Sequence, residues 1–118
     1  MKKVLIIDDD PDILEVLQLT LEMAGYTTKT NLHGEELFNE VSAFKPDIVL
    51  LDILLSGSDG RVLCKQLKSD DATKGIPVIL ISAHPSAQKN IAEVGANDFI
   101  AKPFDIDDLI TRVGKFTD

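Results

Sequence analysis

The chain has 118 residues, and at roughly 150 residues per domain this length predicts one compact domain. Hydrophobic residues make up 44% and charged residues 27%, which is enough apolar material for a core and disfavours disorder. The 20 acidic and 12 basic residues give a net charge of -8, a sign that repels phosphate backbones and anionic lipid surfaces. We therefore expect no direct binding of nucleic acid.

The sequence gives no signal for secretion or for membrane insertion. Its single cysteine, Cys64, has no partner for an internal disulfide, which fits a reducing compartment. The apolar run at residues 4–7 is too short for a signal peptide, and the run at 48–51 is far below the roughly 20 residues that a membrane span needs. We therefore expect a cytoplasmic protein.

Five short β-rich runs alternate with segments in which apolar residues recur at helical spacing. This alternation is typical of a parallel sheet covered by helices on both faces. The runs predict strands at residues 3–7, 27–31, 48–51, 78–82 and 98–101. Most of these runs are continuously apolar, as central parallel strands should be, whereas the second is more polar and is expected at an edge.

Five apolar stripes predict the helices. The first covers residues 13–24 and is followed by Gly25, a common helix stop. The other stripes are Leu37, Val41 and Phe44; Leu63 and Leu67; Ala87, Ile91 and Val94; and Leu109, Ile110, Val113 and Phe116. We expect an α/β fold with a doubly wound, five-stranded parallel sheet in the order 2-1-3-4-5 and five helices, as in flavodoxin-like proteins. Ligands bind such sheets beyond the carboxyl ends of the strands.

Acidic residues follow the first and third predicted strands, which are neighbours in this order. Asp10 before Pro11 is explained as a helix N-cap, but capping does not explain Asp8 and Asp9. Carboxylates about 5 Å apart repel by roughly 3 kcal/mol at an effective dielectric near 20, so Asp8, Asp9 and Asp52 together need a cation. Mg²⁺ is favoured because it needs only one or two carboxylates and accepts phosphate oxygens.

Asp52 ends an apolar run in which an unpaired buried charge would be costly. It is either a residue that caps a strand end or a nucleophile, since a carboxylate can attack a phosphoryl group and hold it as an acyl phosphate. Lys102 and Ser82 follow the fifth and fourth strands and could neutralise and bind the phosphoryl oxygens. Taken singly, each is also explained as an ordinary strand-end or surface residue.

Four sequence strings together resemble the receiver domain of two-component response regulators over essentially the whole chain. They are IIDDDP at residues 6–11, DIVLLD at 47–52, SA at 82–83 and KPF at 102–104. The resemblance implies that Asp52 accepts a phosphoryl group from a phosphohistidine of a sensor histidine kinase or a histidine phosphotransfer protein. It implies a Mg²⁺ site formed by Asp9, Asp52 and the backbone carbonyl of Leu54, with Asp8 acting through water.

The resemblance also implies a conformational switch. Ser82 matches the hydroxyl that binds the phosphoryl oxygen, Phe99 matches the aromatic switch residue, and Lys102 matches the lysine that pairs with the phosphoryl group. The Lys102-Pro103 bond matches a cis peptide of the family. A glycine expected eight residues after the acceptor is present as Gly60, whereas Ser56 replaces a proline that is frequent in the family.

On this basis we expect one receiver domain over residues 1–118 that catalyses its own phosphorylation and slow hydrolysis and is not a conventional metabolic enzyme. The signal would pass to a separate downstream protein, through the face of the fourth helix, fifth strand and fifth helix. A flavodoxin-like cofactor binder is disfavoured because three aspartates repel a phosphate. An aspartate-nucleophile phosphatase would carry a second aspartate where Leu54 stands. The remaining alternative is a phosphorylation-independent, receiver-like binding module.

Overall fold

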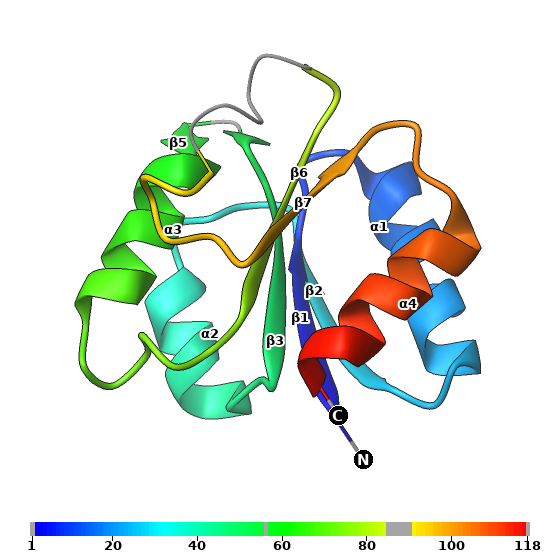
Figure 1. Ribbon diagram of the computed structural model, residues 1–118, viewed down its shortest axis with the longest axis horizontal. Helices are drawn as coiled ribbons and strands as arrows, with labels where there is room; N and C mark the ends of the chain where they lie inside the picture. Colours follow the sequence, from blue (N-terminus) through cyan, green and yellow to red (C-terminus); the bar gives the residue numbers. More distant parts are fainter. Residues whose placement is uncertain (1, 56, 85–90, 118) are drawn as a thin grey trace.

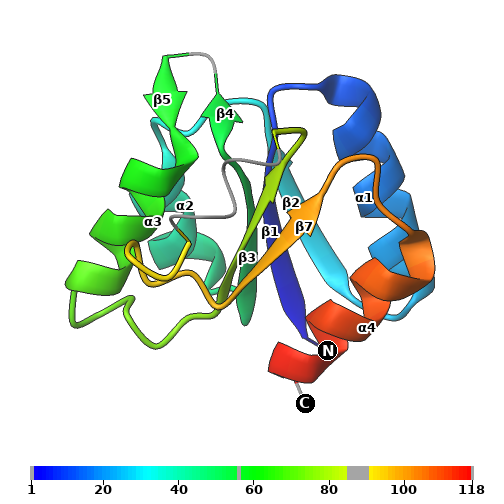
Figure 2. The same cartoon turned by 45° about the horizontal axis from the view of Figure 1, so that its top comes forward.

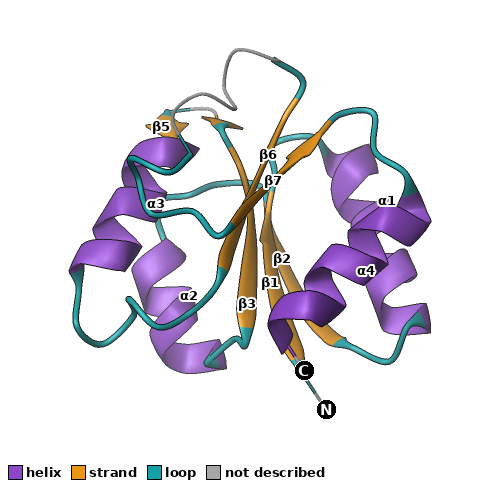
Figure 3. Cartoon of the chain, in the orientation of Figure 1, coloured by secondary structure: helices purple, strands orange, loops and turns teal. Residues whose placement is uncertain are grey.

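Strands and helices alternate along the chain in the computed structural model, which describes residues 2–55, 57–84 and 91–117 (Figures 1 and 3). The strands are β1 (Lys3–Ile7), β2 (Thr27–Asn31), β3 (Ile48–Asp52), β4 (Leu54–Leu55), β5 (Ser58–Asp59), β6 (Val78–Ser82) and β7 (Asp98–Ala101). The helices are α1 (Pro11–Met23), α2 (Leu37–Phe44), α3 (Gly60–Ser69) and α4 (Ile106–Thr117).

Five of the strands form a parallel sheet in the order β2-β1-β3-β6-β7, which confirms the predicted order. The more polar strand β2 lies at an edge, also as predicted. Strands β1 and β3 are neighbours, and Ile7 pairs with Leu51 in their register. The carboxyl ends of β1 and β3 therefore meet at one edge of the sheet.

The apolar strands bury side chains on both faces of this sheet. In β1, Val4 and Ile6 pack on the face covered by α1 and α4, whereas Leu5 and Ile7 pack on the face covered by α2 and α3 (Figure 1). Full burial of each such side chain contributes about 1.5 to 3 kcal/mol to stability. This two-sided burial explains why the strand runs are continuously apolar. It also holds the strands, and therefore their carboxyl ends, in fixed positions.

Helix α1 begins as the sequence predicted. Asp10 caps it, because its carboxylate accepts hydrogen bonds from the backbone N–H groups of Asp12 at 2.9 Å and Ile13 at 3.4 Å. Pro11 occupies the first helical turn, where a missing N–H costs nothing. Gly25, with a φ of 98°, follows the helix. The cap places the start of α1 directly after the acidic end of β1.

The predicted number of helices is wrong for the described residues, which contain four helices instead of five. Of the stripe expected as the fourth helix, Ala87 lies outside the described residues, and residues 91–95 form turns. Ala96 N–H donates to Ile91 O at 3.0 Å and Gly95 N–H to Ala92 O at 3.2 Å, with a φ of 83° at Gly95. These two bonds form the Schellman pattern that ends helices. Helical backbone therefore cannot continue past Gly95, whose conformation is left-handed.

The sequence did not predict the small hairpin of β4 and β5, which follows β3 (Figure 2). Its strands have two residues each, too few to show a period in the sequence. Ser56, expected as a departure from the family pattern, lies outside the described residues. Among the helices that the structure describes, none has the length and apolar character to cross a membrane.

Candidate functional site

Three carboxylates gather at the carboxyl ends of β1 and β3. Asp8 and Asp9 follow β1, and Asp52 is the last residue of β3. Each offers a carboxylate oxygen that lies within 4.8 Å of the corresponding oxygens of the other two. The structure therefore brings together the acidic residues that the sequence singled out, because β1 and β3 are adjacent. The sequence had placed Asp52 just after the strand, whereas the sheet extends to include it.

Two of these carboxylates are removed from water. Asp8 is 0% exposed and Asp52 is 3% exposed, whereas Asp9 is exposed. Asp8 Oδ1 accepts a hydrogen bond from the Asp10 N–H at 2.9 Å, and Asp52 Oδ1 accepts a long one from the Leu54 N–H at 3.4 Å. Asp8 Oδ2 has no hydrogen-bond partner among the described residues. The buried carboxylate oxygens at this site therefore outnumber the hydrogen-bond donors that the described residues offer them.

Lys102 supplies a positive charge to both buried carboxylates. Its Nζ lies 2.9 Å from Asp8 Oδ2 and 3.4 Å from Asp52 Oδ2. The contact with Asp8 is an ion pair whose geometry does not meet that of a hydrogen bond. Burial alone would lower the pKa of Lys102, but the two carboxylates outweigh burial and raise this pKa above its ordinary value. Lys102 is therefore an ammonium ion at neutral pH.

Asp52 is the carboxyl whose titration is most perturbed by this environment. Burial, and next the negative charge of Asp8, raise the pKa of Asp52 from 3.8 to about 7. Lys102 and the Leu54 N–H oppose this change but do not cancel it. A carboxyl that titrates near neutral pH in a cluster of like charges is typical of functional sites.

The donor set at this site fits a small, hard divalent cation. Three carboxylates face one ammonium group within the described part of the chain, so negative charge remains uncompensated. Oxygen ligands are those that Mg²⁺ prefers, and it binds through one or two carboxylates while it keeps several waters. Asp8 Oδ2, which pairs with Lys102 but has no hydrogen bond among the described residues, is a further acceptor for such a hydrated ion.

The predicted hydroxyl lies on β6, next to β3, and the predicted aromatic residue lies on β7, the edge strand beyond β6. Asp52 pairs in register with Ile81, the residue before Ser82, and Ser82 is buried at the end of β6. Ser82 Oγ accepts a hydrogen bond from the His84 N–H at 3.0 Å. Phe99, in β7, is 6% exposed and belongs to the core under α2 and α3.

The end of β7 is joined to the end of β6. The Lys102 N–H donates to Ser82 O at 2.9 Å, so the backbones of these two site residues are bonded. The Lys102-Pro103 peptide bond is cis, as predicted.

Gly60 allows the chain after Asp52 to fold tightly against itself. The Gly60 N–H donates to Ile53 O at 2.8 Å. A Cβ atom added at Gly60 would lie 2.1 Å from the backbone oxygen of Asp52, far inside contact distance. The sequence marked Gly60 through the family resemblance, but this close approach is visible only in the structure.

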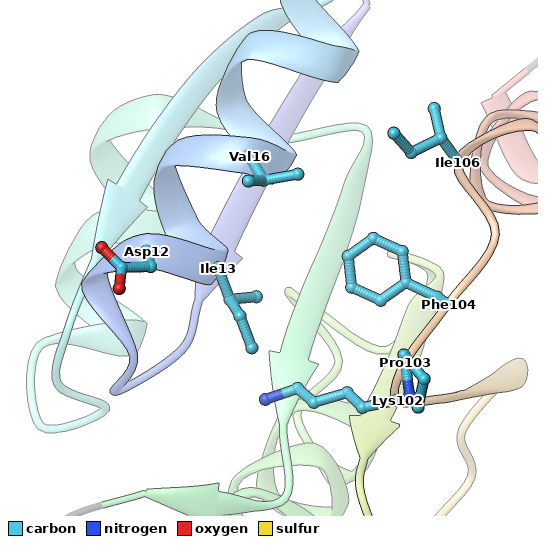
Figure 4. A pocket seen from close by; sticks show the side chains of 7 residues that line it. All are labelled: Asp12, Ile13, Val16, Lys102, Pro103, Phe104 and Ile106. Atoms are coloured by element: carbon cyan, nitrogen blue, oxygen red, sulfur yellow. The ribbon is translucent and has the colours of Figure 1, made fainter.

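An apolar hollow of about 320 Å³, which the sequence did not predict, begins at Lys102. It lies between α1 and the segment that connects β7 to α4 (Figure 4). In this view Ile13 and Val16 of α1 lie opposite Phe104 and Ile106. The residues that line it are Asp12, Ile13, Val16, Lys102, Pro103, Phe104 and Ile106. The hollow thus places an apolar surface beside the acidic site.

The family model described as the response regulator receiver domain matches residues 4–114 of this chain. The chain belongs to this family. The expectation from the sequence strings is thereby confirmed, and with it the assignment to two-component signalling proteins. The competing assignments to a flavodoxin-like cofactor binder and to a phosphatase are set aside.

Curated relatives of this receiver domain are about twice its length. It is 36% identical to the DNA-binding dual master transcriptional regulator RpaA of Synechocystis, over 96% of this chain and 48% of RpaA. It is 38% identical to the phosphate regulon transcriptional regulatory protein PhoB of Pseudomonas aeruginosa, over 95% of this chain and 50% of PhoB. The chain therefore spans about half the length of these relatives. Because RpaA is named as a DNA-binding protein, the expected absence of direct nucleic-acid binding is not confirmed and stays a prediction.

Solved structures give the same family. A response regulator from Chloroflexus aurantiacus superposes with a TM-score of 0.93 at 36% identity, covering 98% of this chain and 97% of that one. The response regulator TrrA of Thermotoga maritima, solved in complex with Mg²⁺-BeF, has a TM-score of 0.89 at 29% identity, covering 98% and 99%. The receiver fold of this chain is thus shared along nearly its whole length.

Proposed function

We propose that this receiver domain is a phosphoryl-accepting switch in which Asp52 takes the phosphoryl group from a phosphohistidine of a sensor histidine kinase or a histidine phosphotransfer protein. The observation that carries the proposal is the buried Asp52 carboxylate flanked by Asp8, Asp9 and the ammonium of Lys102. This arrangement has a nucleophile and groups that neutralise a transferring phosphoryl group, and positioning with electrostatics is most of what phosphoryl transfer requires.

We propose that Mg²⁺ is bound by Asp9, Asp52 and the main-chain carbonyl of Leu54, and by Asp8 through a water molecule. The proximity of the three carboxylates supports this assignment, as does the Mg²⁺-BeF complex of the relative TrrA. When bound, the ion would neutralise charge that develops on the phosphoryl oxygens. The exposed Asp9 and the buried Asp8 would thus both contribute to the binding of one ion.

In the proposed transfer, a carboxylate oxygen of Asp52 attacks the phosphorus atom. The P–N bond to the imidazole breaks, its electron pair returns to the ring nitrogen, and an acyl phosphate forms on Asp52. Lys102 moves its ion pair from the carboxylate to a phosphoryl oxygen, and Ser82 donates its hydroxyl hydrogen to another. Slow hydrolysis follows when water attacks phosphorus, which regenerates the Asp52 carboxylate and releases inorganic phosphate.

The apolar hollow between α1 and Phe104 supports docking of a protein phosphodonor (Figure 4). It begins at Lys102, whose Nζ lies 3.4 Å from Asp52 Oδ2, so a partner seated there would reach the acceptor. Val16 and Ile106 line the hollow and leave 45% and 47% of their surface exposed. Burial of such side chains against a partner would favour association.

The output of the switch would be a changed affinity for a downstream partner. Phe99 and Ser82 would alter the face of residues 91–95, β7 and α4 when Asp52 is phosphorylated. A coupling free energy of about 1 to 3 kcal/mol, typical of allosteric proteins, gives a several-fold to 100-fold response. The partner is either a separate protein, as expected from the sequence, or a further part of a longer chain.

Intact-mass analysis after incubation with phosphoramidate, with and without Mg²⁺, tests the proposal. We expect one phosphoryl adduct on the wild type that requires Mg²⁺, and none on Asp52→Asn, which removes the nucleophile at nearly constant size. Circular dichroism controls for folding of the variant. A folded wild type that binds Mg²⁺ but forms no adduct would favour the alternative of a phosphorylation-independent binding module.

A further inference from the structure

One guanidinium group joins helix α4 to strand β7. Arg112 Nη1 donates to Asp98 Oδ1 at 2.8 Å and to the backbone oxygen of Phe99 at 3.2 Å. Its Nε donates to Asp108 Oδ2, one turn earlier on α4, at 2.9 Å. The planar fork of arginine allows these bonds at once, whereas a lysine ammonium lacks this geometry. Arg112 is thus fixed on its own helix and reaches across to the strand.

Asp98 completes a closed ring around the main chain of Phe99. Its Oδ1 accepts the Arg112 bond and also accepts a hydrogen bond from the Phe99 N–H at 2.8 Å. Both main-chain polar groups of Phe99 are therefore held by the side chains of Asp98 and Arg112. Strand β7 is the last strand of the sheet, where outward main-chain groups have no neighbouring strand to bond.

The ring acts on the segment that carries Lys102 into the acidic site. Phe99 and Lys102 are three residues apart, about 10 Å along an extended strand. The Lys102 N–H is bonded to Ser82 O, and its Nζ lies between Asp8 and Asp52. The side chain of Phe99 is buried in the core, so a shift of its backbone cannot be absorbed by solvent. A shift at Phe99 therefore reaches Lys102.

We propose that Asp98 and Arg112 form a clamp on the main chain of Phe99, and that Arg112 is a positioning residue that couples α4 to the acceptor site through β7 and Lys102. The effects on phosphorylation and on Mg²⁺ affinity rest on the proposed function, whereas the effect on the position of Lys102 does not. A partner whose carboxylates draw Arg112 away from Asp98 would alter the acceptor site. By reciprocity, phosphorylation of Asp52 would alter the affinity of that partner for Arg112.

Opposite changes in the affinity for Mg²⁺ and in the rate of adduct formation would identify Arg112 as a positioning residue. In Arg112→Ala, Lys102 is held less firmly between Asp8 and Asp52 and competes less with a cation. We expect the affinity for Mg²⁺ alone to rise about threefold. We expect the rate of adduct formation from phosphoramidate at saturating Mg²⁺ to fall about threefold, because Lys102 is less well placed for the phosphoryl oxygens. Loss of folded protein would lower both quantities together.

Asp108→Ala is the matched control, because Asp108 accepts a hydrogen bond from Arg112 but makes none with the main chain of Phe99 among the described residues. We expect it to leave both quantities within about 1.5-fold of the wild type. Asp98→Ala, which removes the acceptor of both bonds, should change both in the same directions as Arg112→Ala, and the double variant should add little to either. Arg112→Lys provides a second variant that keeps the charge but loses the fork.

The two proposals fail in different ways. If the wild type binds Mg²⁺ but forms no adduct, the proposed phosphoryl transfer fails, and the Mg²⁺ titrations of the same variants still decide whether the clamp reaches the acidic site. If Arg112→Ala has the Mg²⁺ affinity of the wild type, or if affinity and rate fall in parallel in a variant that circular dichroism shows to be folded, the clamp does not position Lys102 and the inference is overturned.

Discussion

Lys102 Nζ lies 2.9 Å from Asp8 Oδ2, closer than the 3.4 Å that separates it from the Asp52 oxygen. The lysine is thus paired first with the carboxylate that is completely buried, and only second with the acceptor. Because Asp8 Oδ2 has no hydrogen bond among the described residues, Lys102 is the charge that makes its burial tolerable. In the resting protein this lysine therefore has a structural role besides the one proposed in phosphoryl transfer.

Lys102→Ala should destabilise the protein most strongly when Mg²⁺ is absent. The variant leaves Asp8 and Asp52 buried without the ammonium, and loss of one partner of a buried ion pair costs about 3 to 5 kcal/mol. Urea unfolding at pH 7.5 measures this loss, with exposed Lys115→Ala on α4 as the control. Addition of Mg²⁺ should restore part of the stability of Lys102→Ala. Equal stability of the two variants without Mg²⁺ would contradict the structural role.

The titration of Asp52 should make the metal-free protein less stable as pH rises. Its pKa is raised to about 7 in the folded state from 3.8, so the folded state holds its proton more tightly than the unfolded state. The stabilisation from Asp52 is full below pH 3.8 and is lost as pH rises through 7, with a total of roughly 4 kcal/mol at 1.36 kcal/mol per pKa unit. Urea unfolding from pH 4 to 9 should show this loss in the wild type but not in Asp52→Asn.

The same proton should compete with Mg²⁺. Below pH 7 the Asp52 carboxyl must lose its proton before it can bind the ion, so the apparent Mg²⁺ affinity should fall up to about tenfold per pH unit. Asp52→Asn should bind more weakly with a flatter pH profile. A wild-type affinity that stays constant between pH 5 and 8 would contradict competition between this proton and Mg²⁺.

The strand pattern and the acidic cluster could be predicted because both depend on local sequence and on simple topology. A continuous apolar run marks a buried parallel strand, and adjacency of β1 and β3 brings Asp8, Asp9 and Asp52 together. The end of β3 was missed by one residue, since aspartate is rare in strands. The cap at Asp10 was predicted because its signal is entirely local.

The features that were missed depend on contacts between distant parts of the chain. The ring of Asp98, Phe99 and Arg112 joins a strand to a helix that begins several residues later, and an apolar stripe does not show it. The hollow beside Lys102 exists only once α1 and α4 have packed on the same face of the sheet. In the described part of the stripe expected as a helix around residue 91, residues 91–95 form turns instead, and apolar spacing does not show such a turn.

Gly60→Ala should damage the acceptor site through the backbone of Asp52. The added methyl group would lie 2.1 Å from Asp52 O, so either the strand end or the start of α3 must move. We expect a loss of about 1 to 3 kcal/mol in the free energy of unfolding, the usual cost of overpacking. The rate of adduct formation should also fall at least tenfold. Gly75→Ala is the control, because its Cβ would meet nothing within 4 Å; a fully active Gly60→Ala would show that Asp52 tolerates the shift.

Val16→Ser should weaken phosphoryl transfer from a protein donor without affecting transfer from a small one. Val16 lines the apolar hollow, and loss of its methyl groups from a contact of about 30 to 40 Å² at 25 cal/mol per Å² removes about 1 kcal/mol of association free energy. The kcat/KM with a phosphorylated histidine phosphotransfer protein should therefore fall about fivefold. Labelling by phosphoramidate, which needs no docking surface, should stay unchanged. Val62→Ser on α3 provides the control, because Val62 is 53% exposed against 45% for Val16 and does not line the hollow. Equal loss in both valine variants would argue against docking at this hollow.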